Sequence, residues 1–344
     1  MKNLKNYIPI IVGCLIIFGL IAFSFIYTYF IKDTLKPPPT FLYNDEGKMI
    51  GTYGYPPSLD FLLGVDRYGR DVFWMVIDGA KYTIAIALVV GLMRVLFGVL
   101  FGSFYGFVNK KIGFVIEPIF NAFRFVPAVI ILLPFFRLLD SGYSHSKEQT
   151  IFLQLLLLII IAIPILMNTI GEEVRAYLKN DFIISSKIIG ANTIWLQRKH
   201  VFPFLRTRLL LLFVQQTIQT LFLLTQLGVF KLFIGGLMIL HLDLGVDRPM
   251  SKANEWSAMI GSNFFELSID PWVIIGPSVA FIITIFAFNL IKLGIEKMIN
   301  KPSASKRSDK DDLEDKFPEL KDFEFVNKEK REHSTKKEGS YVLT

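Results

Sequence analysis

Six long apolar stretches, separated by polar ones, occupy the first 300 residues of the chain. The first stretch, 8–31, has no charged residue, and as a helix it would be about 36 Å long, enough to cross the ~30 Å hydrocarbon layer of a membrane. The pattern predicts an all-α integral membrane protein with six transmembrane helices. The predicted spans are 8–31, 82–108, 112–136, 150–170, 209–240 and 271–290, the last continuing toward Ile295. Pro127 interrupts the third, and the fifth is longer than needed and is broken by Lys231 and Gly235-Gly236.

The order of the spans predicts the topology. Lys2 and Lys5 precede the first span and favour a cytoplasmic N-terminus, and an even number of spans returns the C-terminus to the same side. A cleaved signal peptide is the alternative for this span, but the run is too long and no small-residue cleavage site follows it. The loops at 109–111 and 171–208 then face the cytoplasm. The resulting division is an N-terminal transmembrane anchor, an extracytoplasmic segment, a five-helix core and a charged cytoplasmic tail, at 1–31, 32–81, 82–297 and 298–344.

Composition agrees with this class of protein. Hydrophobic residues make up 52% of the chain and charged residues only 19%, which excludes a disordered chain and is unlike a cytosolic enzyme. Cys14 is the single cysteine, so an internal disulfide is excluded. The acidic and basic residues of the tail balance, so the net charge of +7 belongs to the first 300 residues, where it fits membrane-edge loops. The composition of the tail predicts a solvated, disordered segment. A docking arm for a cytosolic partner is the alternative.

No catalytic motif is present in the sequence. The chain has no H-E-x-x-H, C-x-x-C, G-x-S-x-G or Walker sequence. His241, Asp243 and Asp247 could imitate metal ligands, but their place in a loop favours solvated polar residues. We therefore expect a protein that is not an enzyme and carries no cofactor or metal. Any energy input would come from another subunit.

Polar residues inside the predicted spans are candidates for a transport path, because burying them in lipid is costly. Gln215, Gln219 and Gln226 follow one face of the fifth span, where an amide row suits a polar, peptide-bonded solute. Interhelical hydrogen bonding that only holds the bundle together is the alternative. Arg94 and Asn121 are further path candidates. Ion pairing between spans is the competing role for Arg94, Glu117 and Arg124.

The polar stretch 171–208 has the order helix, glycine, short helix and proline. A helix through Lys187 is broken at Gly190, and a second amphipathic segment reaches His200 before Pro203. This order predicts a helical hairpin at the membrane surface that offers a docking site to a cytosolic protein. An amphipathic loop that lies on lipid headgroups is the alternative.

Specific residues of this stretch resemble the EAA loop of bacterial ABC-importer permeases. The run 185–190 ends in Gly190, and His-Val-Phe-Pro follows at 200–203 with the spacing of that loop. The His-Val-x-Pro ending is similar to the peptide and nickel branch, as are Glu173-Val174 and Asp181-Phe182-Ile183 upstream.

Two other regions agree with the same family. A signature that precedes the second span in this family is similar to Pro56-Pro57-Ser58 and to the run 63–72, Leu-Gly-Val-Asp-Arg-Tyr-Gly-Arg-Asp-Val. The similarity continues at Gly79-Ala80 and Thr83. Near the end, 255–259, Pro271-Trp272, Pro277 and 287–290 resemble a W-G-x-M, P-W and A-F-N-L pattern. Three ordered signatures over residues 1–297 resemble the C-type permease of a dipeptide, oligopeptide or nickel importer.

The resemblance implies a type I ABC-importer permease in the bacterial cytoplasmic membrane. Its expected partners are a second homologous permease, cytosolic subunits that bind ATP and Mg²⁺, and an extracytoplasmic solute-binding protein. It places ATPase coupling on the loop, at Glu173, Asp181, Ser185, Ser186, Gly190, His200 and Pro203.

The chain departs from the family pattern at the centre of the loop. Ile184 stands at the glutamate position, and Ser185 and Ser186 stand at the two alanine positions. These changes indicate a divergent member. A permease for a nickel chelate or modified peptide, and a non-transporting permease that acts as a membrane anchor or regulator, remain alternatives to peptide import.

Overall fold

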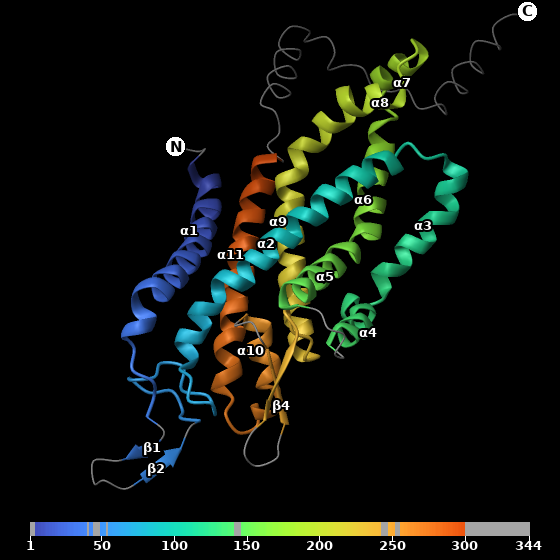
Figure 1. Cartoon of the computed structure of the whole chain (residues 1–344). Coiled ribbons are helices and arrows are strands. Elements are labelled where there is room, and N and C mark those ends of the chain that lie inside the picture. Colours follow the sequence, from blue (N-terminus) through green and yellow to red (C-terminus); the bar gives the residue numbers. More distant parts are fainter. Residues whose placement is uncertain are drawn as a thin grey trace, which may run out of the picture. The chain divides into compact units, whose positions relative to one another are not determined.

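The computed structural model describes residues 4–39, 41–43, 49–52, 54–140, 146–241, 247–251 and 255–299. This part of the chain is mostly helical (Figure 1). The predicted tail lies outside the described residues, except for 298–299, which belong to the last helix. The α-helices are α1 (Leu4–Ile26), α2 (Val72–Tyr105), α3 (Lys110–Phe125), α4 (Ala128–Asp140), α5 (Lys147–Ile160), α6 (Ile163–Tyr177), α7 (Asp181–Ile188), α8 (Thr193–Leu196), α9 (Phe202–Val229), α10 (Trp256–Ser262) and α11 (Trp272–Ile299).

Among the described residues, five helical stretches are long and apolar enough to cross a membrane. A sixth is the bent pair Lys111–Phe125 and Ala128–Leu139, if it is counted as one span. The prediction of a multi-span helical protein is confirmed at this level. The five stretches are Tyr7–Thr34, Val72–Tyr105, Lys147–Tyr177, Thr193–Val229 and Trp272–Ile299.

The predicted third span, 112–136, is bent at the interruption predicted at Pro127. The chain bends by 81° between α3 and α4. Val126 is extended there, with φ −94° and ψ 121°, because the ring of Pro127 disfavours a helical conformation in the preceding residue.

The helix of the predicted fifth span, 209–240, ends at the predicted break and does not reach residue 240. Helix α9 stops at Val229, and Lys231, Gly235 and Gly236 all have positive φ values of 56°, 91° and 83°. Left-handed residues cannot continue a right-handed helix. The apolar residues that follow form strand β3 (Leu237–His241), which pairs antiparallel with β4 (Asp247–Ser251).

Helix α2 begins ten residues before the predicted second span. Asp71 caps it by accepting hydrogen bonds from the backbone N–H groups of Phe73 (2.9 Å) and Trp74 (3.4 Å). Residues 72–81, predicted in the extracytoplasmic segment, are therefore helical. Earlier in that segment, β1 (Phe41–Tyr43) pairs antiparallel with β2 (Met49–Thr52).

The helices pack around one large apolar core. Helix α1 lies along α11, and α2 lies against α6 and α9, as Figure 1 shows. Close contacts depend on small residues: a Cβ at Gly91 in α2 would lie 2.7 Å from the hydroxyl oxygen of Thr217 in α9. Trp256 of α10 is fully buried in this core, and its indole N–H donates to the carbonyl of Val76 at 2.7 Å.

The two ends of the molecule carry different structures. Helices α7 and α8 lie at one end, and β1, β2, β4 and α10 lie at the opposite end (Figure 1). A second, smaller apolar cluster supports the α7–α8 end and includes Val174, Ile183, Leu196 and Leu205.

Candidate functional site

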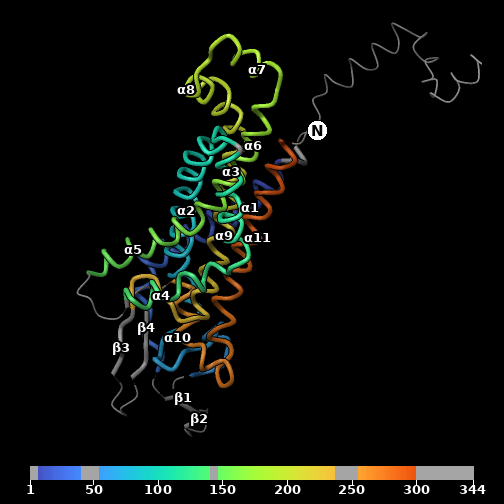
Figure 2. The backbone as a smooth tube through the Cα atoms, turned by 90° about the vertical axis from the view of Figure 1, so that its right-hand side faces the viewer, coloured from blue at the N-terminus to red at the C-terminus, as the bar shows by residue number. Residues whose placement is uncertain are grey.

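Helices α7 and α8 form a hairpin, residues 181–201, beyond the ends of the long helices (Figure 2). Gly190 separates them with φ +101°. The N–H of Gly190 donates to the carbonyl of Lys187, and the N–H of Ala191 donates to that of Ser186, both at 3.0 Å. These two bonds form a Schellman motif, whose left-handed residue is best supplied by glycine. No other atom lies within 4 Å of a Cβ built at Gly190, so the backbone angle, not crowding, requires the glycine.

The second helix of the hairpin is capped and then joined directly to a membrane helix. Asn192 accepts a hydrogen bond from the backbone N–H of Trp195 at 2.8 Å. A π-helical turn, Gln197–Val201, follows α8 and continues without a loop into α9. Because the helix is continuous, a displacement of the hairpin also displaces the start of α9.

Buried side chains hold the hairpin on the bundle. Ile183 of α7, Leu196 of α8 and Val201 of the π turn are almost fully buried, and they pack in the smaller apolar cluster with Val174 of α6. Next to the hairpin, an ion pair joins the two helices that flank it: Arg208 Nη1 of α9 lies 2.7 Å from Glu173 Oε1 of α6.

The outer surface of the hairpin is unusually apolar. Ile188 and Ile189 are 80% and 87% exposed beside Gly190. We call this the apolar hairpin surface; its members are Phe182, Ile184, Ile188, Ile189, Ile194 and Trp195. Two hollows of about 390 and 340 Å³ lie on the same surface, next to Trp195. A patch of this kind is typical of a protein-interaction site.

The structure brings most of the predicted coupling residues to this hairpin. Asp181 is the first residue of α7, and the hydroxyls of Ser185 and Ser186 donate to the carbonyls four residues earlier, at 2.9 and 2.8 Å. The serines therefore satisfy their hydroxyls inside the helix. Glu173 lies outside the hairpin, in α6, where it pairs with Arg208.

His200 and Pro203 lie where the hairpin joins α9. The imidazole of His200 packs against Phe182 and Trp195, with ring centroids 5.7 and 5.3 Å away. His200 thus holds α7 and α8 together at the open side of the hairpin. Pro203 is the second residue of α9, where the π turn changes to α-helix, and it lacks the N–H that would continue the hydrogen-bond ladder there.

The predicted glutamine row remains accessible in this single chain. Gln219 and Gln226 are exposed and Gln215 is half-buried on α9, while Gln216 is buried. The row faces away from the core of the chain, as either a solute path or an interface with another helix requires. Its role stays a prediction.

Arg94 and Asn121 do not join that row. Arg94 is 2% exposed and donates two hydrogen bonds to the carbonyl of Leu158, at 2.9 and 2.6 Å, near the end of α5. This placement favours a structural role for Arg94. Asn121 of α3 accepts a hydrogen bond at 2.9 Å from Asn168 of α6, which also donates to Glu172.

The other charged residues of the third predicted span also contact α6. Glu117 lies 3.9 Å from Arg175, and Arg124 donates to the hydroxyl of Thr169 at 3.0 Å. These contacts agree with the alternative in which such residues join spans.

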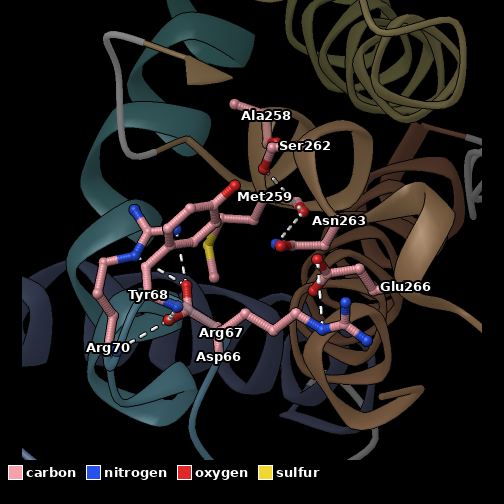
Figure 3. Close-up of polar contacts among 9 residues, drawn as sticks. All are labelled: Asp66, Arg67, Tyr68, Arg70, Ala258, Met259, Ser262, Asn263 and Glu266. Carbon is pink, nitrogen blue, oxygen red and sulfur yellow. Dashed lines mark hydrogen bonds and ion pairs between the residues drawn. The ribbon is translucent and has the colours of Figure 1, made fainter. Parts of the chain in front are cut away.

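The opposite end carries a compact turn built on Asp66 (Figure 3). Asp66 accepts from the backbone N–H groups of Tyr68 (3.0 Å) and Arg70 (2.8 Å), and it pairs with the Arg70 guanidinium at 2.7 Å. Gly64 and Gly69 have φ values of +72° and +73°. The two left-handed glycines and the hydrogen bonds to Asp66 together make this a tight turn.

A long-range ion pair joins this turn to the segment before α11. Arg67 Nε lies 2.9 Å from Asp270 Oδ2 and 3.6 Å from Glu266 Oε1. Asn263 is buried nearby and donates to the carbonyl of Met259 (Figure 3). No sequence signal identified these partners, because about 200 residues separate Arg67 from them.

Glu255 caps α10 from a fully buried position. Its carboxylate accepts from the N–H and hydroxyl of Ser257, at 2.8 and 2.6 Å. Burial raises the pKa of Glu255 to about 7, and these hydrogen bonds oppose that shift. The Glu255 carboxylate stabilises the fold as the N-cap of α10. None of the described residues forms an ion pair with it.

Comparison with known proteins gives the family. Residues 94–301 match the model of the binding-protein-dependent transport system inner membrane component. The chain belongs to this family. The match spans α2 to α11 and so includes the hairpin and the glutamine row.

Several relatives have names that concern peptides. The chain is 24% identical over 284 residues to the peptide transport system permease protein SapC of Haemophilus influenzae, covering 81% of this chain and 87% of the relative. It is 25% identical to the oligopeptide transport system permease protein OppC of Bacillus subtilis, covering 71% and 73%. It is 22% identical to the dipeptide transport system permease protein DppC of Alkalihalophilus pseudofirmus, with the same coverage.

Family membership adds to what the structure shows. The chain is a multi-pass membrane protein, and it is the permease component of a transport system that also has ATP-binding and solute-binding proteins.

Proposed function

We propose that this chain is a transmembrane subunit of an ATP-driven ABC transporter that imports di- or oligopeptides across the bacterial cytoplasmic membrane. The names of the relatives support the solute class. The observation that carries the coupling role is the α7–α8 hairpin, which presents an exposed apolar surface and is joined directly to α9.

The proposed topology counts the bent pair α3–α4 as one span. Six spans then place both termini and the hairpin in the cytoplasm, and the Asp66 turn outside. In this orientation 1–31 is an anchor, 32–71 is extracytoplasmic, and α2 to α11 form the permease core. A second homologous permease, cytosolic ATPase subunits and an extracytoplasmic solute-binding protein complete the transporter.

The proposed mechanism transmits motion through the hairpin. The apolar hairpin surface docks on an ATPase subunit, with Asp181, Ser185, Ser186 and Gly190 in the docking helix and its turn. Closure of the ATPase dimer on ATP displaces the hairpin, and α9 moves with it because helix joins the two. Glu173 and Arg208 tie α6 to the same movement. The solute path between the two permeases then opens alternately to each side.

The function is tested by purifying the tagged chain from mild detergent and assaying peptide uptake in the corresponding deletion strain. Recovery of a second permease and an ATPase, together with loss of labelled di- or oligopeptide uptake on deletion, is the expected result. Recovery of the chain without an ATPase would support the anchor or regulator function instead. Uptake of a nickel chelate but not of peptides would reassign the solute.

The glutamine row is proposed to line the solute path. Replacing Gln215 and Gln219 by leucine is expected to reduce peptide uptake about tenfold, because each lost hydrogen bond to a solute amide contributes about 0.5–1.5 kcal/mol. The complex should still assemble, since neither amide makes a described hydrogen bond within the chain. Uptake and co-purification are measured on the same variant; loss of assembly would instead assign the row to helix packing.

A further inference from the structure

A deep apolar groove lies between α2 and α9, near the end that carries the hairpin. It encloses about 880 Å³. Its walls include Leu92, Leu96 and Leu100 of α2 and Leu210 and Phe213 of α9, all of them wholly or partly exposed. Helices α2 and α9 touch where Gly91 meets Thr217, and the groove occupies the stretch between that contact and the hairpin.

The length of the groove matches one leaflet of a bilayer. From Leu92 to Phe104 the wall on α2 is about 18 Å long at 1.5 Å per residue. Half of the hydrocarbon layer is about 15 Å. An extended acyl chain therefore fits between the Gly91–Thr217 contact and the membrane surface at the hairpin.

Two arginines form part of the wall at the hairpin end. Arg198 of the π turn and Arg206 of α9 are both exposed, and neither forms an ion pair with an acidic group anywhere in the described part of the chain. Arg208, two residues after Arg206, is by contrast paired with Glu173. Gln197 also reaches this end of the groove, where its side-chain amide donates to the hydroxyl of Ser103.

The groove is separate from the proposed solute path. Phe213 lines the groove, whereas Gln215 is two residues further along α9, about 200° around the helix. None of the three glutamines of the row lines the groove. A peptide bound in this groove would also place its amide groups against an almost wholly apolar wall.

We propose that this groove binds an anionic phospholipid of the cytoplasmic leaflet. One acyl chain lies along the leucines of α2, and the phosphate contacts Arg198 and Arg206. Basic residues at the cytoplasmic mouth of an apolar pocket between membrane helices suit such a headgroup, whose negative charge complements the two arginines. The lipid then contacts α2, the π turn and α9 together, at the junction through which hairpin motion reaches the membrane.

The inference rests on the orientation in the proposed function, but its test needs neither ATP nor a solute. The full chain is purified with its partner subunits and placed in nanodiscs of phosphatidylcholine with or without one-fifth phosphatidylglycerol. Lipid retained after re-extraction into detergent is quantified by mass spectrometry. We expect phosphatidylglycerol to be enriched over phosphatidylcholine, and Arg198→Gln with Arg206→Gln to weaken its retention about tenfold.

A matched control separates this site from general charge attraction. Lys187→Gln with Lys199→Gln removes the same charge from the hairpin without altering the groove wall, and should retain phosphatidylglycerol within twofold of the unmodified chain. A further variant, Leu96→Trp, fills the groove at unchanged charge and should also reduce retention. Equal retention of the two lipids, or equal loss in the arginine and lysine variants, would overturn the proposal while leaving peptide import standing.

Discussion

Replacing Gly190 by proline is expected to reduce peptide uptake more than tenfold while the chain still enters the membrane. Proline fixes φ near −65°, whereas Gly190 has φ +101°. Proline also removes the N–H that donates to Lys187 in the Schellman motif. The hairpin therefore cannot keep its angle, and movement of the docked α7 is no longer passed through α8 to α9. ATP hydrolysis by the assembled complex should continue without matching uptake.

A graded series distinguishes this backbone effect from simple instability. Gly190→Ala keeps the N–H and meets no neighbour, so its cost is the strained φ alone, about 1–3 kcal/mol, and its uptake should fall less than that of the proline variant. Gly19→Ala is the matched control, because a Cβ there also meets nothing within 4 Å and Gly19 lies inside α1. Normal uptake by the Gly190→Pro variant would contradict the coupling role of the hairpin.

Most of the membrane helices could be predicted from the sequence because uncharged runs of more than twenty residues have few alternative structures. The chain departs from a straight helix where an apolar run contains a residue that determines the backbone, and the sequence marks these residues without giving the structure that results. Pro127 bends the third run, and Lys231 with Gly235-Gly236 ends the fifth. Hydropathy reports how apolar a segment is, and it does not report whether that segment is helix, bend or strand.

The hairpin could be predicted in outline, but its surface could not. Gly190 and Pro203 mark its turn and its junction with α9 in the sequence. Ile183 is buried while its neighbour Ile184 is exposed, and a helix of eight residues is too short for periodicity to separate them. The partners of Arg94 and Arg67 lie 64 and 203 residues away, so only the folded chain brings them together.

The structure also changes how the missing glutamate of the loop is understood. Ile184 is partly exposed and belongs to the same surface as Ile188 and Ile189. Where the family pattern has a carboxylate, this chain therefore extends an apolar patch. We infer that docking on the ATPase subunit depends here on apolar burial, and that the cleft facing this chain is correspondingly apolar.

Replacing Ile188 and Ile189 by aspartate is accordingly expected to abolish co-purification of the ATPase subunit. The two side chains are 80% and 87% exposed, so the hairpin itself gains little from them. Burying an isoleucine side chain contributes about 1.5–3 kcal/mol, and losing two should weaken docking by about a hundredfold or more. The buried charges would add to that loss. The measurement is the amount of ATPase recovered per amount of tagged chain, with uptake assayed in parallel.

Leu59→Asp is the matched control for this variant. Leu59 is 98% exposed, but it lies in the segment before α2, at the opposite end of the molecule from the hairpin. Its replacement adds a charge at an exposed apolar position and should leave ATPase recovery unchanged. Full recovery in the Ile188 and Ile189 variant would show that the apolar hairpin surface is not the docking site. If a variant that keeps Ile188 and changes only Ile189 recovers the ATPase normally, Ile188 is the larger contributor to docking. Its position on α7, four residues after Ile184, places the two side chains beside each other.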